Sequence, residues 1–114
     1  MHEMGLVQNI LEIVEQEMDK HGVAKIAAVH LSVGAMACVV PGQMRSCFAI
    51  LTENSRLAGA ELKMTIVPVT YRCAACCKEF TSEGISLECP CCRAGAPEMI
   101  AGRELQVESL EIMD

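Results

Sequence analysis

Four cysteines in the C-terminal half of the chain form two Cys-x-x-Cys pairs separated by twelve residues. The first pair is Cys73 and Cys76, and the second is Cys89 and Cys92. Thiolates are soft ligands that suit zinc, which binds four of them in a tetrahedron. Since four thiolates leave no open coordination position, the spacing predicts a structural rather than a catalytic site, with one Zn(II) per chain.

Other chemistry fits the same cysteines. An iron–sulfur cluster or a rubredoxin-like iron would use four thiolates, and a dithiol redox pair would need only one of the two motifs. Cys77 and Cys91 adjoin proposed ligands, and either could replace its neighbour in a shifted register. Neither turn has the glycine that often follows the second cysteine, because Cys77 and Arg93 occupy those positions. Cys38 and Cys47 are interpreted as small buried hydrophobic residues.

A second candidate metal site lies at the N-terminus. The imidazole of His2 is one residue from the α-amine of Met1, and both could chelate one ion together with the backbone amides of His2 and Glu3. Square-planar nitrogen ligation suits Ni(II) or Cu(II) rather than Zn(II). Taken alone, however, a histidine at position 2 is more often an ordinary residue of a frayed terminus.

Composition limits the class of protein. The chain has 114 residues, a net charge of −6 and 52% hydrophobic residues, so we expect a folded chain without a nucleic-acid partner. No apolar run has the length of a membrane span, and we find no signal peptide. Clustered cysteines favour metal over disulfides in the reducing cytoplasm, which is the expected location. We find no catalytic triad, carboxylate pair or phosphate-binding glycine loop, and we expect no enzyme.

Hydrophobic periodicity predicts the elements that position these residues. Helices are expected over residues 4–20 and 41–55, and strands over 24–34, 61–71 and 103–113. Because Pro68 cannot donate a backbone hydrogen bond, we expect the second strand to leave the sheet at this residue. A bulge near Glu108 and Ser109 would reconcile two hydrophobic phases in the last strand. The predicted fold is α/β (α+β): a small three-stranded sheet packed with two helices, plus an inserted four-cysteine zinc module.

Together these motifs resemble the HypA/HybF family of nickel metallochaperones, which act in nickel–iron hydrogenase maturation. The matching segments are Met1-His2-Glu3, Ile13-Val14-Glu15-Gln16, Val33-Gly34-Ala35, Cys38, Cys47-Phe48, Gly59-Ala60, both cysteine pairs with Cys89-Pro90 at the second, Gly102-Arg103-Glu104-Leu105-Gln106-Val107 and Glu111-Ile112. They span almost the whole chain.

The resemblance implies nickel at the N-terminus, with the His2 side chain as a ligand and main-chain groups of Met1, His2 and Glu3 nearby. It also implies structural zinc at the four paired cysteines. Residues 1–70 and 103–114 would form the nickel-binding domain and residues 71–102 the zinc-binding module. Ni(II) would be transient cargo for the hydrogenase large-subunit precursor.

The implied partners are a HypB-type GTPase, that precursor and, in some family members, urease maturation proteins. No membrane partner is expected, and a homodimer is compatible with the sequence. His30 could approach the nickel, although a strand histidine is more often an ordinary surface residue.

Two other functions compete with this one. A zinc-ribbon module for protein interaction or nucleic-acid binding would need the four cysteines but no nickel. In that reading a basic surface is expected, whereas the basic residues near the cysteines are balanced by acidic ones. A thiol redox enzyme would use the surplus cysteines and would oxidise reversibly without losing a metal.

Overall fold

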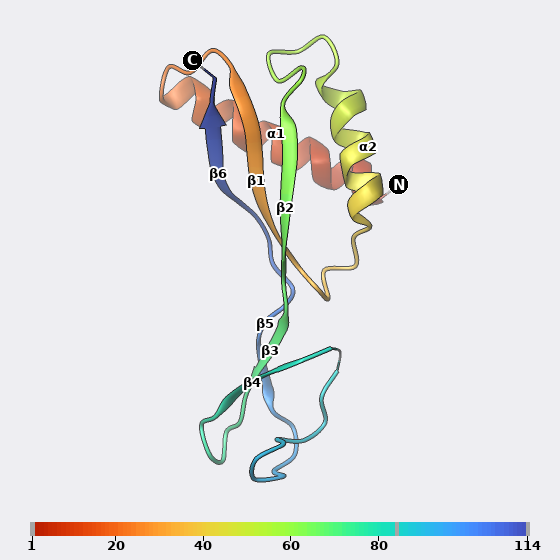
Figure 1. The fold of residues 1–114 in the computed structure, drawn as a ribbon, viewed down its shortest axis with the longest axis vertical. Coiled ribbons are helices and arrows are strands. Elements are labelled where there is room, and N and C mark those ends of the chain that lie inside the picture. Colours follow the sequence, from red (N-terminus) through yellow and green to blue (C-terminus); the bar gives the residue numbers. More distant parts are fainter. Residues whose placement is uncertain (1, 84, 114) are drawn as a thin grey trace. The chain divides into compact units, whose positions relative to one another are not determined.

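The computed structural model describes residues 2–83 and 85–113. Its elements, labelled in Figure 1, are α1 (His2–Lys20), β1 (Ile26–Gly34), α2 (Pro41–Thr52), β2 (Glu61–Val67), β3 (Val69–Arg72), β4 (Glu79–Ser82), β5 (Glu98–Ala101) and β6 (Leu105–Ile112). The predicted fold class is confirmed: two helices accompany a three-stranded sheet of order β2-β1-β6 in the part of the chain that the structure describes. A second sheet, of order β4-β3-β5, was not predicted.

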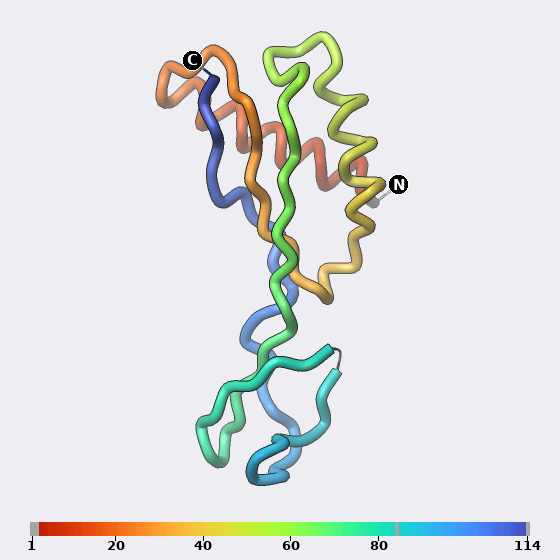
Figure 2. Tube along the Cα trace, in the orientation of Figure 1, coloured from red at the N-terminus to blue at the C-terminus, as the bar shows by residue number. Residues whose placement is uncertain are grey.

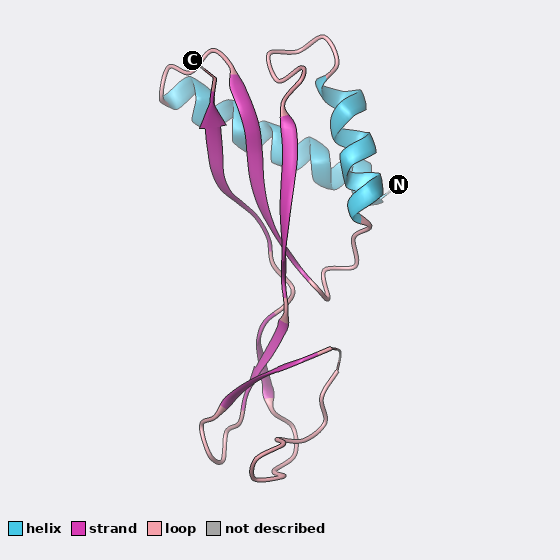
Figure 3. Ribbon diagram, viewed as in Figure 1, coloured by secondary structure: helices cyan, strands magenta, loops and turns pink. Residues whose placement is uncertain are grey.

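The chain divides into two compact units. The first comprises Met1–Ser32, Val39–Thr65 and Gln106–Asp114, and the second comprises Val33–Cys38 and Ile66–Leu105. Both described helices belong to the first unit, where Figure 3 shows them alongside the longer strands. The two cysteine pairs belong to the second unit. No described helix is long and apolar enough to cross a membrane. The division into nickel-binding and zinc-binding domains stays a prediction.

Helix α1 buries one stripe of side chains in the core of the first unit. Val7, Ile10, Val14 and Met18 recur every three or four residues, and each is at most 5% exposed. Glu3 precedes Val7 by four residues on the same stripe and is only 7% exposed. An apolar stripe thus faces the core along α1, and it continues into a buried carboxylate at the start of the helix.

Local sequence explains where the helices end. After α1, Gly22 takes the left-handed conformation with φ +65°, and the N–H of Val23 donates to the carbonyl of Met18 at 2.8 Å. This is the usual glycine C-cap of a helix. We predicted that helix α2 continues to Ser55, but it stops at Thr52. The helix ends there because Asn54 has a left-handed φ of +64°, which helical residues do not adopt.

Two buried-residue predictions had different outcomes. Cys47 lies in α2 and is 3% exposed, as expected. The interpretation of Cys38 as a buried residue is wrong, because this side chain is exposed. Cys38 lies in the irregular segment between β1 and α2 with φ +60°, and its thiol donates to the carbonyl of Met36 at 3.6 Å.

The three strands of the first sheet largely match their predictions. Strand β1 is central and begins two residues later than expected, and Val29 and Leu31 are at most 2% exposed. Pro68 separates β2 from β3, as predicted. In β6, Glu108 and Ser109 are both exposed, which is the phase change that a bulge would produce. The bulge itself stays a prediction.

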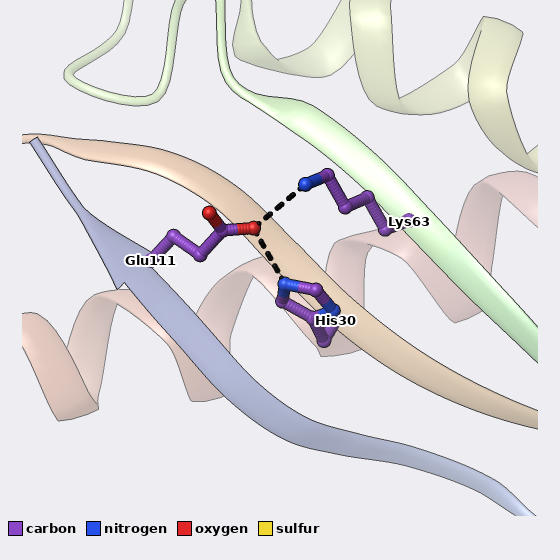
Figure 4. A network of polar contacts seen from close by, with 3 residues as sticks. All are labelled: His30, Lys63 and Glu111. Atoms are coloured by element: carbon purple, nitrogen blue, oxygen red, sulfur yellow. Dashed lines mark hydrogen bonds and ion pairs between the residues drawn. The ribbon is translucent and has the colours of Figure 1, made fainter.

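Three polar side chains from the three strands meet on one face of this sheet (Figure 4). The Nζ of Lys63 donates to Oε2 of Glu111 at 2.9 Å, and Nε2 of His30 lies 2.6 Å from the same oxygen. Successive strand residues point to opposite faces, so His30 points away from the face that buries Val29 and Leu31. On the polar face of the sheet, His30 and Lys63 therefore share the carboxylate of Glu111.

We expect acid to break this three-residue contact. The hydrogen bond from Lys63, followed by that from His30, holds the pKa of Glu111 below its ordinary value of 4.5. A lowered carboxyl pKa contributes stability above the unfolded value, and this contribution is lost as pH falls through the folded value. An NMR titration of the Glu111 carboxyl carbon should show the lowered pKa in the wild type. Lys63→Met should raise that pKa, and an unchanged value would contradict the role of Lys63.

The second unit is built on strand β3. It pairs antiparallel with β4, which places Tyr71 directly opposite Phe80, and with β5 on its other side. The two rings stack with centroids 5.6 Å apart. Tyr71 is 3% exposed, and its hydroxyl accepts a hydrogen bond from the N–H of Ser86 at 3.0 Å. This tyrosine thus connects the small sheet to the loop between the cysteine pairs.

Two glycines allow close backbone packing in the second unit. A Cβ on Gly34 would lie 2.2 Å from both the carbonyl carbon and the oxygen of Gly102. Gly102 has φ +122°, a backbone conformation that residues with a side chain rarely adopt. The N–H of Gly34 donates to the carbonyl of Glu104 at 2.7 Å. The chain can therefore cross itself at this point only without side chains.

Candidate functional site

The four paired cysteines converge in the second unit. Their sulfurs lie within 4.8 Å of one another; Cys73 and Cys92 are 3.4 Å apart, and Cys76 and Cys89 are 3.8 Å apart. Four sulfurs at about 2.3 Å from a tetrahedral zinc are about 3.8 Å from one another. The donor set and its spacing therefore fit a single metal ion such as zinc.

Both cysteine pairs lie on the same kind of backbone turn. In each turn the N–H of the first cysteine donates to the carbonyl five residues later, and its own carbonyl accepts from the N–H four residues later. These bonds, of 2.8–2.9 Å, join Cys73 to Lys78 and Cys77, and Cys89 to Ala94 and Arg93. Figure 2 shows the chain doubling back at both places. Local hydrogen bonds thus position two sulfurs per turn.

The two residues that follow the cysteine pairs occupy positions where glycine is common. Cys77 and Arg93 have φ of +62° and +64°, in the left-handed region that favours glycine. Both turns therefore adopt the conformation that glycine favours, at some cost in strain. Cys77 and Cys91 are exposed and lie outside the described four-sulfur cluster. The structure thus brings together the four cysteines that the spacing favoured.

Local contacts lower the pKa of some of these thiols and raise that of others. The N–H of Cys76 is the main group that lowers the pKa of Cys73 to about 6, and the N–H of Cys92 likewise lowers that of Cys89. For Cys76, the N–H of Lys78 lowers the pKa, but desolvation and the neighbouring thiols raise it to about 12. Four crowded thiols do not all ionise together unless a cation compensates their charge. A divalent metal ion would provide that charge.

Burial distinguishes the first cysteine of each pair from the rest of its turn. Cys73 and Cys89 are 1% and 0% exposed. Amide groups also face these sulfurs: the N–H of Cys76 points at Cys73 at 3.5 Å, and that of Cys91 at Cys89 at 3.4 Å. Two sulfurs are therefore fixed inside the unit, and the exposed Cys92 approaches from the surface.

The predicted N-terminal site is only partly described. Met1 lies outside the described residues, and His2 begins α1 without a described side chain. The buried carboxylate of Glu3 accepts a hydrogen bond from the N–H of Val40, just before α2, at 3.4 Å. Sequence reasoning missed this contact, although the four-residue spacing from Glu3 to Val7 could have indicated burial. The nickel ligands stay a prediction.

The other two histidines contact carboxylates. His21 lies 3.4 Å from Glu17 at the end of α1, and His30 lies 2.6 Å from Glu111. In the described part of the chain, neither histidine belongs to a group of three or more potential metal ligands.

The fold and the converging cysteines define a small metal-binding protein with one helix-and-sheet unit and one cysteine-bearing unit. The sequence model of a family described as "Hydrogenase/urease nickel incorporation, metallochaperone, hypA" matches residues 1–112. The chain therefore belongs to the HypA family of nickel metallochaperones for hydrogenase and urease.

Relatives of similar length support this assignment. The chain is 39% identical to the hydrogenase maturation factor HypA of Desulfosudis oleivorans, covering 100% of both proteins. It is 41% identical to the factor of the same name from Chloroflexus aurantiacus, covering 97% of this chain and 98% of the relative.

Two solved structures share the fold. One, described as "Solution structure of HypA protein", has a TM-score of 0.76 and 23% identity, covering 99% of this chain and 97% of that one. The Ni metallochaperone HypA from Helicobacter pylori has a TM-score of 0.69 and 21% identity, covering 97% of both chains.

Proposed function

We propose that this chain binds Ni(II) at its N-terminus and delivers it to the precursor of the nickel–iron hydrogenase large subunit. The observation that carries the proposal is the family match over residues 1–112, a range that includes His2. Nickel is the cargo in this proposal, and it leaves with the client. The chain acts as a carrier and not as an enzyme.

The proposed nickel ligands are the α-amine of Met1, the imidazole of His2 and the backbone amides of His2 and Glu3. Such a nitrogen plane suits Ni(II). A cation at a helix N-terminus opposes the helix dipole, but deprotonated amides and the nearby Glu3 carboxylate offset this charge. Chelation by consecutive backbone nitrogens needs ψ near zero, whereas a helix has ψ of about −42°. Nickel binding therefore rearranges the first turn of α1.

Zinc has a structural role in this proposal. One Zn(II) joins Cys73, Cys76, Cys89 and Cys92, and sulfur separations of 3.4 and 3.8 Å support the assignment. Four thiolates fill the coordination sphere, so the ion activates neither water nor substrate. Its role is to hold the two turns in one shape.

The proposed partners follow from delivery to a client. A HypB-type GTPase takes part in the transfer, and urease maturation proteins are further partners; the family description includes both hydrogenase and urease. The proposed location is the cytoplasm, where clustered thiols stay reduced. Proton competition for the imidazole, or withdrawal of the terminus by a partner, releases the nickel.

Nickel titration of untagged, zinc-loaded protein tests the proposal. Wild-type protein should bind about one Ni(II) with the absorbance of a square-planar complex. His2→Ala should lose this nickel and keep its zinc, because the imidazole is a ligand only for nickel. His21→Ala is the matched control, since His21 contacts Glu17 at the other end of α1. If His2→Ala and wild type bind nickel equally, or if neither binds it, the proposal fails.

A further inference from the structure

An apolar groove lies between α1 and β6 in the first unit. Its volume is about 370 Å³, and its apolar lining includes Ile13, Met18, Ile26, Val107, Leu110 and Ile112. Ile13 and Ile112 are 48% and 60% exposed, although both are large hydrophobic residues. Exposed apolar side chains that gather around a groove are typical of a binding surface.

The groove runs along the edge of a sheet. Strand β6 is last in the order β2-β1-β6, and Figure 1 shows it at the outer edge with α1 behind it. Among the described residues, no strand pairs with its outer side. The backbone N–H and C=O groups on that side of an edge strand can therefore accept a further strand.

The rim of the groove is acidic. Glu17 and Glu108 line it, together with His21. Glu17 lies 3.8 Å from Lys20 and 3.4 Å from His21, whereas Glu108 has no ion-pair partner within the described residues. The whole chain carries a net charge of −6. An occupant with lysine or arginine side chains would thus complement the rim.

We propose that this groove binds an extended, basic segment of another protein, which adds a strand to the outer edge of β6. Alternate side chains of such a strand face the same side, so its apolar residues would enter the groove beside Ile13 and Ile112. Its basic residues would approach Glu108. Backbone hydrogen bonds provide affinity in this mode, and the groove and the acidic rim select the sequence.

A second copy of this chain fits the edge less well. Strand β6, Leu105–Ile112, contains Glu108 and Glu111 but no lysine or arginine. Glu111 is already paired with Lys63, but pairing of β6 with itself would bring two copies of Glu108 to one interface, and β6 offers no basic residue between them. Like charges on adjacent strands destabilise pairing. The absence of basic residues in β6 favours a basic partner over self-association.

A pair of short peptides tests the proposal on the full-length, zinc-loaded protein. Acetyl-Lys-Val-Lys-Val-Lys-amide is titrated into ¹⁵N-labelled protein, and acetyl-Glu-Val-Glu-Val-Glu-amide serves as the charge control. We expect the basic peptide to shift the amide signals of β6 and of the α1 residues around Ile13 in a saturable way. Binding should weaken as salt is added. The acidic peptide should cause no saturable shift.

Two matched substitutions locate the binding surface. Ile13→Asp should weaken peptide binding about tenfold, because the lost aliphatic contact and the desolvation of the new carboxylate outweigh its attraction to the lysines. Ile50→Asp should leave binding unchanged, since Ile50 is 61% exposed on α2 and does not line the groove. Glu108→Lys should weaken the basic peptide and strengthen the acidic one.

Three results would overturn the proposal. One is a basic peptide that shifts only signals outside α1 and β6, or none. Another is an equal effect of Ile13→Asp and Ile50→Asp. The third is a dimer in sedimentation experiments that Ile13→Asp disperses, because the occupant would then be a second copy of the chain.

Discussion

Replacing Cys89 by serine should abolish zinc binding and unfold the second unit, whereas replacing Cys91 should do neither. The sulfur of Cys89 is completely buried and lies 3.8 Å from that of Cys76. Structural zinc contributes roughly 10 kcal/mol or more to the folding of small four-ligand domains. The core of the second unit is small, so it cannot replace this contribution. Loss of one buried thiolate should therefore remove both the ion and the fold that depends on it.

Two signals separate this result from general unfolding. Zinc content per chain reports the ion directly. Emission from Tyr71, the one tyrosine in a chain without tryptophan, reports the second unit. Helical ellipticity reports the first unit and should change little.

The neighbouring cysteines are matched controls. Cys91→Ser and Cys77→Ser should keep about one zinc per chain, because both side chains are exposed and lie outside the sulfur cluster. If Cys77→Ser or Cys91→Ser lost zinc while Cys89→Ser kept it, the ligand set would be wrong.

Gly34→Ala should destabilise the second unit by about 1–3 kcal/mol or more. The added Cβ would lie 2.2 Å from the backbone of Gly102, and the N–H of Arg103 is also close, at 2.5 Å from the Cβ to its nitrogen. Backbone atoms cannot rotate away as a flexible side chain can. The added methyl group must therefore push the backbone at Gly34 and the backbone at Gly102 apart.

Gly42→Ala is the control for this substitution. Gly42 lies in α2, and a Cβ there would meet nothing within 4 Å. Within a helix, alanine is more favourable than glycine by up to about 1 kcal/mol. Urea unfolding followed by Tyr71 emission measures the first variant, and helical ellipticity measures the second. Equal stability of Gly34→Ala and wild type would show that the crossing is looser than the structure indicates.

Periodicity and spacing predicted the parts of the molecule that depend on local sequence. The cysteine site was predictable because each pair is positioned by hydrogen bonds within its own turn. The apolar stripe of α1 and the buried face of β1 were also visible, since both are longer than two periods of their pattern. The helix-and-sheet fold follows from these elements.

The second sheet could not be predicted in the same way. Strands β4 and β5 have only four residues each, too few to show a reliable alternation. Contacts between segments far apart in the sequence also could not be predicted from it. Gly34 against Gly102, and Glu3 against Val40, join residues that no local pattern relates. The exposure of Cys38 depends on an irregular segment with a left-handed residue, which its apolar neighbours did not reveal.

The separation of both described helices from the lone tyrosine makes the cooperativity of unfolding directly visible. Ellipticity at the helical wavelength follows one unit, and Tyr71 emission follows the other. In one thermal scan, coincident midpoints would indicate a single two-state transition. Separate midpoints would indicate two independent transitions, and a single free energy of unfolding would then have no meaning for this chain. Stability measurements on any variant should therefore record both signals.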